Sequence, residues 1–358
     1  MRGRHRRSAL VALMGFATLA LVVEGAGSSP GRATLGPQTV VTFPGDVDSF
    51  AQDGEFMAWA QGGEGLFGAG VVEIYNLPAS RRTLLGRAYD IYEGDPNLPL
   101  DGFALAGTRV LLADLDGDDV CSNTECTFQM YTAALDDRPL RNAGYSSYSD
   151  ANAFSFLPPR IPVAGDGSTL AYFDCSGYEC GKAYSTIRRI VRGHDYKVAN
   201  SPYPTALATD AGRIAAAVLL KKRTPARSEI SIWAKGVARF RVAGKVLALA
   251  LSGSRVALLA RDAGRTRLEV RRAGNGSLER RLALPDATRP SVSIAGPTVV
   301  FQVGQTVRVL DARTGRISSV AVVEGHAIGL SIEGVRVAWA ERFKNGPDRV
   351  RALILGRS

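Results

Sequence analysis

Short runs in which apolar and charged residues alternate recur along the chain, separated by turns that contain glycine. The stretch 247–285 holds four such runs, LALALS, RVALLARD, TRLEVRR and LERRLAL, with turns at Gly253, Gly264 and Gly276. A period of two places apolar side chains on one face of a strand, and glycine-bearing turns join successive strands into hairpins. The stretch is therefore predicted to form a four-stranded antiparallel meander.

The first half of this unit, an apolar strand, a glycine turn and a second apolar strand, occurs seven times. The copies are FAQDGEFMAWA, FALAGTRVLLADL, IPVAGDGSTLAYFD, ALATDAGRIAAAVL, ALALSGSRVALLA, PSVSIAGPTVVFQV and IGLSIEGVRVAWA. Their turn glycines, 38 to 60 residues apart, are Gly54, Gly107, Gly167, Gly212, Gly253, Gly296 and Gly334. Glycine fits because a two-residue hairpin needs positive φ. Four-stranded units repeating every ~40–45 residues are typical of propeller blades. We predict an all-β fold, a seven-bladed β-propeller of four-stranded antiparallel blades.

The seventh copy ends the chain after only three strands, whereas one strand precedes the first copy. This strand is QTVVTFP, residues 38–44. We predict that it pairs as the outer strand of the last blade and closes the ring, which removes an open sheet edge. The alternative is a disordered linker. The expected organisation is an export signal over 1–28, a short linker over 29–37 and a single propeller domain over 38–358.

The repeat resembles those of TolB-like and WD40-like bacterial β-propellers over essentially the whole mature chain. No Trp-Asp dipeptide closes a blade, and the Pro-Asp-Gly turn of TolB-type repeats is replaced by AQDGE, AGDGS and LSGS. The resemblance implies a propeller fold, and for TolB it implies work with the outer-membrane Tol–Pal system. Because the turns depart from that pattern and a fold does not fix a function, we carry over the fold alone.

The N-terminus has the layout of an export signal. Arg2, Arg4, Arg6 and Arg7 precede the apolar run 9–23, and small residues follow that run. A basic segment, a short apolar segment and a small-residue tail are typical of a cleaved signal peptide. The run is shorter than the ~20 residues of a comfortable bilayer span. We expect an extracellular or cell-envelope protein without a transmembrane helix after cleavage; the alternative is a membrane tether formed by an uncleaved N-terminal segment.

The cysteines form two pairs of the same spacing. Cys121 and Cys126 lie in CSNTEC, and Cys175 and Cys180 lie in CSGYEC. Both pairs follow the second strand of a repeat, and export makes disulfides possible, so each pair is predicted to staple a hairpin loop. The alternative is a zinc site built from four thiolates, although zinc knuckles usually space their cysteines more closely.

Charge is distributed unevenly between the two halves of the ring. Residues 33–180 contain 21 acidic and 7 basic side chains, whereas residues 181–358 contain 12 acidic and 32 basic ones. A basic flank formed by 221–223 together with Arg271, Arg272, Arg280 and Arg281 predicts weak contact with an anionic surface. The alternative is that these charges keep blade edges from pairing with other chains. Few aromatic residues lie among the arginines, so no specific nucleic-acid partner is expected.

Long insertions in the first three blades are expected to gather on one face of the disc. They are GGEGLFGAG, AYDIYEGDPNLPLD, DGDDVCSNTEC and AGYSSYSDANAFSFLPPR. Long loops on a rigid scaffold are where binding residues concentrate. The predicted site for a protein or cell-envelope partner consists of Tyr89, Tyr92, Glu93, Asp95, Tyr145, Tyr148, Asp150 and Phe154. The alternative is that these aromatic side chains pack the loops themselves.

One insertion has the oxygen spacing of a calcium loop. Positions 1, 3, 5, 9 and 12 of such a loop fall on Asp114, Asp116, Asp118, Ser122 and Glu125. Alternate acidic residues can converge on a hard cation because the chain turns around it. Position 6, which usually holds glycine, is Asp119. A Ca²⁺ site is therefore one hypothesis and a solvated acidic turn is the other; no further cofactor is expected.

The residue inventory argues against common enzyme chemistries. The chain has three histidines, and it has no G-x-S-x-G, H-E-x-x-H, P-loop or dinucleotide-binding motif. Paired cysteines leave no thiolate nucleophile. We expect a monomeric, non-enzymatic binding or scaffolding propeller with no catalytic residues. The alternative is a carboxylate- or metal-dependent propeller enzyme of lyase or glycosidase type, using the same loop surface.

Overall fold

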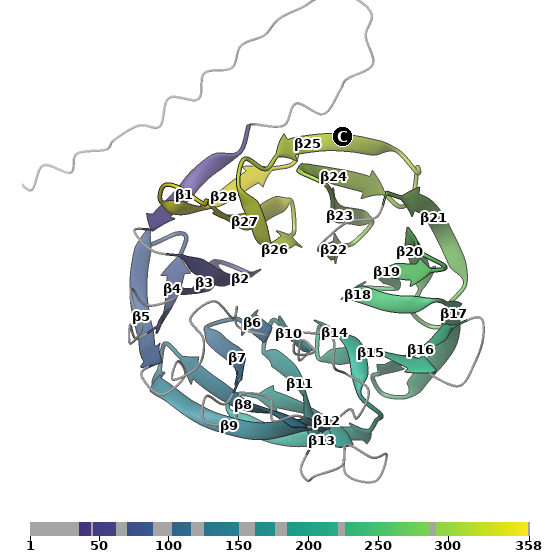
Figure 1. Cartoon of the computed structure of the whole chain (residues 1–358), viewed down its shortest axis with the longest axis horizontal. Helices are drawn as coiled ribbons and strands as arrows, with labels where there is room; N and C mark the ends of the chain where they lie inside the picture. Colours follow the sequence, from purple (N-terminus) through teal and green to yellow (C-terminus); the bar gives the residue numbers. More distant parts are fainter. Residues whose placement is uncertain are drawn as a thin grey trace, which may run out of the picture.

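The computed structural model describes residues 36–43, 46–61, 70–88, 102–115, 125–149, 162–175, 185–220, 226–285 and 291–356. These residues form twenty-eight strands, β1 to β28, and no helix. The strands build seven four-stranded antiparallel blades arranged around a central axis (Figure 1). The predicted all-β, seven-bladed propeller is confirmed. Within the described ranges there is accordingly no helix of the length and hydropathy that a bilayer crossing requires.

Blades 1 to 3 come first along the chain. Blade 1 consists of β2 (Val47–Asp53), β3 (Phe56–Gln61), β4 (Gly70–Asn76) and β5 (Arg81–Ala88). Blade 2 consists of β6 (Gly102–Ala106), β7 (Arg109–Leu115), β8 (Glu125–Ala134) and β9 (Asp137–Ser149). Blade 3 consists of β10 (Val163–Asp166), β11 (Thr169–Cys175), β12 (Ser185–Val191) and β13 (His194–Asn200). A single parallel pairing of Ser146 with Cys175 joins the sheets of blades 2 and 3.

The remaining blades are more compact. Blade 4 consists of β14 (Pro204–Asp210), β15 (Arg213–Leu220), β16 (Arg227–Trp233) and β17 (Val237–Ala243). Blade 5 consists of β18 (Lys245–Ser252), β19 (Arg255–Asp262), β20 (Arg265–Arg272) and β21 (Leu278–Leu284). Blade 6 consists of β22 (Val292–Ala295), β23 (Thr298–Val303), β24 (Thr306–Asp311) and β25 (Ile317–Val322). Blade 7 consists of β26 (His326–Glu333), β27 (Arg336–Arg342), β28 (Asp348–Ile354) and β1 (Gln38–Phe43).

The N-terminal strand closes the ring, as predicted. β1 pairs antiparallel with β28, with Phe43 opposite Asp348. Phe43 is fully buried, and its ring meets that of Trp59 in blade 1 edge-on at 4.9 Å between centroids. Asp348 accepts a hydrogen bond from the backbone N–H of Val47 at 2.7 Å, which ties blade 7 to the start of blade 1. Each innermost strand contacts the innermost strands on both sides, and β26 contacts β2.

The hydrophobic core lies between neighbouring blades. The second strand of a blade is covered on both faces, so it is a continuous apolar run; Val256 to Ala260 in β19 are all buried. The turn glycines behave as the repeat predicts, with φ between 54° and 78°. Six of them occupy the first position of the two-residue turn, whereas Gly212 occupies the second position after Ala211, whose φ is 48°. Blade 4 therefore has two successive left-handed residues in this turn, as in a type I′ hairpin.

Candidate functional site: a cationic groove between blades 3 and 4

The two faces of the propeller differ in their connections. Because the strands of a blade alternate in direction, turns joining its first to second and third to fourth strands emerge on one face, here called the turn face. Links from second to third strands and from blade to blade emerge on the opposite face, here called the loop face. The strand ends that flank the four long insertions lie on the loop face, which agrees with the predicted clustering of those insertions.

Most of the predicted binding residues lie outside the described part of the chain. These are Tyr89, Tyr92, Glu93, Asp95, Asp150 and Phe154. The prediction that 143–149 belongs to a loop is wrong, because β9 continues through Ser149 and pairs Tyr145 with Gln129 and Tyr148 with Cys126. The strand extends this far because β8 is ten residues long and offers pairing partners along its whole length. The side chains of Tyr145 and Tyr148 are not among those described.

The predicted calcium loop and disulfides are described only in their backbone, and only in part. Asp114 lies in β7 opposite Gln129, and Glu125 begins β8 opposite Ser149. The side chains of Asp114 and Glu125 are not described. Asp116, Asp118 and Ser122 lie wholly outside the described residues. Among the cysteines, Cys126 lies in β8 and Cys175 ends β11, without described side chains, whereas Cys121 and Cys180 lie outside the described ranges. The calcium site and both disulfides stay predictions.

On the turn face, a set of hydrogen bonds links each of five blades to the next. The last residue of an innermost strand accepts a hydrogen bond from a backbone N–H in the first turn of the following blade. The donor and acceptor pairs are Gly107 with Asp53, Ala211 with Asp166, Gly253 with Asp210, Gly296 with Ser252, and Gly54 with Glu333. We call this set the blade latch. The two remaining acceptor positions hold Ala106 and Ala295, which have no side-chain oxygen.

Three latch carboxylates lie close together at the mouth of the central channel. Asp53, Asp166 and Glu333 each offer an oxygen atom within 4.8 Å of the others. Burial, followed by the nearby negative charges of Asp53 and Asp210, raises the pKa of Asp166. Burial, followed by Asp53 and Asp166, likewise raises the pKa of Glu333. Carboxylates spaced in this way could coordinate a hard cation. Since each already accepts a backbone N–H, we assign them to the latch, on the face opposite to the predicted loop surface.

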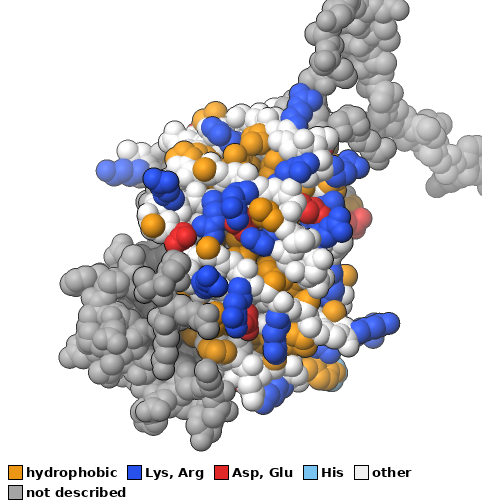
Figure 2. All heavy atoms as spheres, turned by 90° about the vertical axis from the view of Figure 1, so that its right-hand side faces the viewer, with side chains coloured by type: hydrophobic (Ala, Val, Ile, Leu, Met, Phe, Trp, Pro, Cys, Tyr) orange, Lys and Arg blue, Asp and Glu red, His pale blue; other side chains and the backbone are white. Residues whose placement is uncertain are grey.

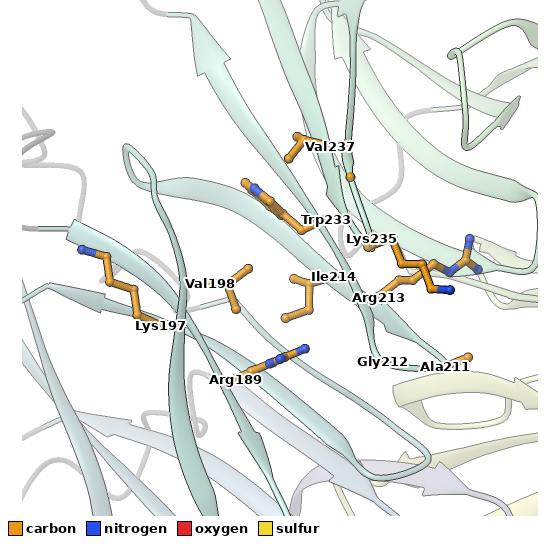
Figure 3. A pocket seen from close by; sticks show the side chains of 12 residues that line it. Arg189, Lys197, Val198, Ala211, Gly212, Arg213, Ile214, Trp233, Lys235 and Val237 are labelled. Atoms are coloured by element: carbon orange, nitrogen blue, oxygen red, sulfur yellow. The ribbon is translucent and has the colours of Figure 1, made fainter.

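A groove of about 620 Å³ lies between blades 3 and 4 on the turn face (Figure 3). Its lining residues are Arg189, Lys197, Val198, Ala211, Gly212, Arg213, Ile214, Trp233, Ala234, Lys235, Gly236 and Val237. Arg189 reaches in from the blade 3 wall, whereas Lys235 comes from the turn at the end of β16 in blade 4. Lys197 lies at the outer end, and its ammonium group points away from the other labelled side chains (Figure 3).

The groove carries an excess of positive charge. Four of its lining residues are basic and none is acidic. Arg213 pairs with Asp210 beneath the groove. Arg189, Lys197 and Lys235 have no carboxylate partner among the described residues, although the guanidinium of Arg189 lies 5.7 Å from the ring centre of Tyr196. Positive charge that the protein does not neutralise attracts anionic ligands.

The positive charges of the basic flank predicted from the sequence are neutralised by acidic side chains to a larger extent than those of the groove. Figure 2 shows many Lys and Arg side chains on the side of the ring that carries β17 and β21. Arg271 and Arg281 pair with Glu269, which is fully buried, and Arg272 pairs with Glu279. Arg280 donates to backbone carbonyls, and residues 221–223 lie outside the described ranges. Contact of this flank with an anionic surface stays a prediction.

Sequence reasoning missed the groove because its walls come from different repeats. Arg189 belongs to STIRRIV in blade 3, and Trp233 and Lys235 belong to SEISIWAKG in blade 4. The sequence signal that could have indicated the groove is the pair of residues that flanks the turn between the third and fourth strands of a blade. In blade 4 this pair is Trp233 and Val237, an aromatic and an aliphatic residue at a position where polar residues would suit solvent.

The comparisons with known proteins concern the fold. No protein-family model and no curated protein matches the chain. The β-propeller domain of the Trilobed protease from Pyrococcus furiosus has 12% identity and a TM-score of 0.53, over 88% of this chain and 96% of that one. An acylaminoacyl peptidase in complex with Z-Gly-Gly-Phe-chloromethyl ketone has 12% identity and a TM-score of 0.50, over 88% of this chain and 51% of that one.

An uncharacterized protein from Listeria monocytogenes EGD-e has 8% identity and a TM-score of 0.45, over 87% of this chain and 92% of that one. The chain spans about half the length of the acylaminoacyl peptidase and nearly all of the Trilobed protease domain. At these identities a structural likeness establishes a shared fold and nothing about activity. The chain is a β-propeller that is similar in fold to the Trilobed protease domain. The resemblance of its repeats to TolB-like or WD40-like propellers stays a prediction.

Proposed function

We propose that this chain is an exported, non-enzymatic binding module that engages an anionic protein or cell-envelope component. A ring whose innermost strands contact those of both neighbouring blades is suited to presenting a fixed surface to a partner. The signal-like N-terminus supports export, and the resemblance of the repeats to TolB-like propellers is consistent with work in the cell envelope. Both remain parts of the proposal.

The observation that carries the proposal is the charge of the groove between blades 3 and 4. Elsewhere in the basic half, arginines are grouped around buried acids, as Arg267 and Arg271 are around Glu269. In the groove, Arg189 and Lys235 lie beside apolar side chains without a carboxylate partner in the described part of the chain. Cations left unneutralised in a concave site are available to a partner, and complementary charge speeds its association.

Retention of charged polymers on the immobilised protein tests this proposal. Poly-L-glutamate is expected to bind at low salt and to be released at high salt. The double variant Arg189→Glu/Lys235→Glu should lose retention. The matched control Lys245→Glu/Lys344→Glu changes the net charge equally at two exposed lysines outside the groove and should keep it. Equal retention by both variants would show that overall charge, rather than the groove, is responsible.

A further inference from the structure

We propose that the groove binds an acidic peptide segment in which an apolar side chain lies between two carboxylates. This inference rests on the proposed function and names the chemistry of its ligand. The groove combines two features that such a segment would satisfy together, an exposed apolar strip and basic side chains from two blades beside it. Each feature is set by the position of particular residues in blades 3 and 4.

The apolar strip is a ladder across three strands of blade 4. Ile214 in β15 pairs with Trp233 in β16, and Trp233 pairs with Val237 in β17, so the three side chains share one face of the sheet. Exposure increases along the ladder, from 1% at Ile214 through the half-buried Trp233 to 52% at Val237. The hydrophobic core of the blade thus continues to the surface at this point and stays open to solvent.

The cations at the border of the strip come from two neighbouring blades. Arg189 projects from β12 of blade 3, and Lys235 projects from the turn between β16 and β17 (Figure 3). The ring of Tyr196, 47% exposed, lies beside the Arg189 guanidinium in blade 3. The carboxylates that flank an apolar residue are on short flexible side chains, so they can turn toward Arg189 and Lys235 while the apolar group covers the ladder.

The apolar ladder argues for a peptide over a simple anion. Phosphate or a uniformly charged polymer would satisfy Arg189 and Lys235 but would leave Trp233 and Val237 in contact with water. Covering apolar area stabilises a complex because it removes that surface from water. The indole N–H of Trp233 has no acceptor among the described residues and can donate to a peptide carbonyl. The volume of about 620 Å³ lies within the range of ligand sites.

The tryptophan content of the chain provides a specific reporter. The chain has three tryptophans, and Trp59 and Trp339 are both 0% exposed. Trp233 is the half-buried one, so ligand-dependent changes in emission and in quenching by acrylamide report on the groove. The Trp233→Phe variant removes this signal. Anisotropy of a fluorescein-labelled peptide then measures binding to the variant without relying on tryptophan.

The test titrates the full-length protein with acetyl-Asp-Leu-Asp-Leu-Asp-amide. We expect saturable binding with a change in Trp233 emission, weakened about tenfold or more in Arg189→Glu/Lys235→Glu and by a rise in salt from about 50 to about 500 mM. The control Lys245→Glu/Lys344→Glu should bind like the unaltered protein. The peptide acetyl-Asp-Gly-Asp-Gly-Asp-amide should bind about tenfold more weakly, because it has the charge without the apolar groups.

The outcomes separate this inference from the proposed function. Equal affinity for the leucine and glycine peptides, or for inorganic pyrophosphate, would overturn the peptide assignment and leave an anion-binding module in place. Saturable binding of the leucine peptide without any change in Trp233 emission would overturn the groove as the site. Failure of every acidic probe to bind would overturn both proposals.

Discussion

Asp53, at the end of the innermost strand of blade 1, accepts a hydrogen bond from the backbone N–H of Gly107, 54 residues later in blade 2. The same arrangement recurs between four further pairs of neighbouring blades. In blades 1, 2, 5 and 6 the turn glycine therefore has two roles: its positive φ forms the hairpin, and its N–H binds the preceding blade. The five acceptor side chains lie at the ends of their innermost strands, so the hydrogen bonds of the blade latch surround the mouth of the central channel.

Two substitutions at Asp53 separate its hydrogen bond from its charge. In Asp53→Ala the N–H of Gly107 loses its acceptor, and we expect the free energy of unfolding to fall by about 1 kcal/mol. In Asp53→Asn an acceptor oxygen remains and one of three adjacent negative charges is removed, so stability at neutral pH should be equal or higher. Denaturant unfolding followed by circular dichroism measures both; an equal loss in the two variants would contradict the latch.

The raised pKa values of Asp166 and Glu333 predict that these two carboxyl groups lower the stability of the folded chain as pH rises. Their ordinary values are 3.8 and 4.5, and burial with neighbouring carboxylates raises both in the folded chain. A carboxyl group with a raised folded-state pKa binds more protons when folded, so its contribution to stability declines as pH rises above the ordinary value. Asp166→Asn/Glu333→Gln should gain melting temperature relative to the unaltered protein between about pH 4 and pH 7. A difference in melting temperature between the two proteins that does not change with pH would contradict the raised pKa values.

Glu269 is the buried counter-charge for three arginines. Its carboxylate pairs with Arg267, Arg271 and Arg281, and although burial opposes ionisation, hydrogen bonds from Arg267 and Arg271 hold its pKa below the ordinary value. Glu269→Gln leaves these guanidinium groups without their partner, and we expect a loss of about 2 kcal/mol in unfolding free energy.

The matched control for this substitution is Glu229→Gln in blade 4. Glu229 pairs with Arg241, whose side chain is 51% exposed, and an exposed pair contributes about 0–1 kcal/mol. Thermal unfolding of the two variants side by side compares a buried cluster with a solvated pair. A similar loss in both would mean that Glu269 does not neutralise its arginines in the way described.

Closure of the ring can be tested without removing β1. Phe43→Ala deletes a fully buried ring that packs on Trp59 between the closing strand and blade 1. A cavity of this kind costs about 3–5 kcal/mol, so the variant should melt earlier. Release of β1 would also expose the edge of β28, so self-association is expected in size-exclusion chromatography near the melting transition. Unchanged stability and a monomeric profile would contradict closure through β1.

The repeat made the fold predictable, because its two signals are local in sequence. A period of two defines a strand, and a glycine such as Gly253 marks the adjoining turn; ring closure followed from the strand at 38–43 and the incomplete last blade. Alternation of apolar and polar residues does not reveal whether the polar face of a strand contacts solvent or other side chains. Glu269 alternates with apolar neighbours in β20, yet it is buried against arginines rather than exposed to solvent.

The site was harder to predict because it depends on contacts between repeats. Asp53 and Gly107 belong to different blades, as do Arg189 and Trp233, and no local pattern states which residues meet across a blade interface. The extent of β9 was missed for a related reason. Serine and glycine in 143–149 are common in loops, but the length of β8 provides partners that outweigh those propensities.

Hydrogen–deuterium exchange of the whole protein with and without saturating poly-L-glutamate locates the binding surface directly. The account predicts slower exchange at the two turns that border the groove, 211–212 and 234–236, and little change on the loop face of blades 1 to 3. Protection confined to the loop-face segments, or no protection at these turns at saturation, would contradict the assignment of the groove as the binding site.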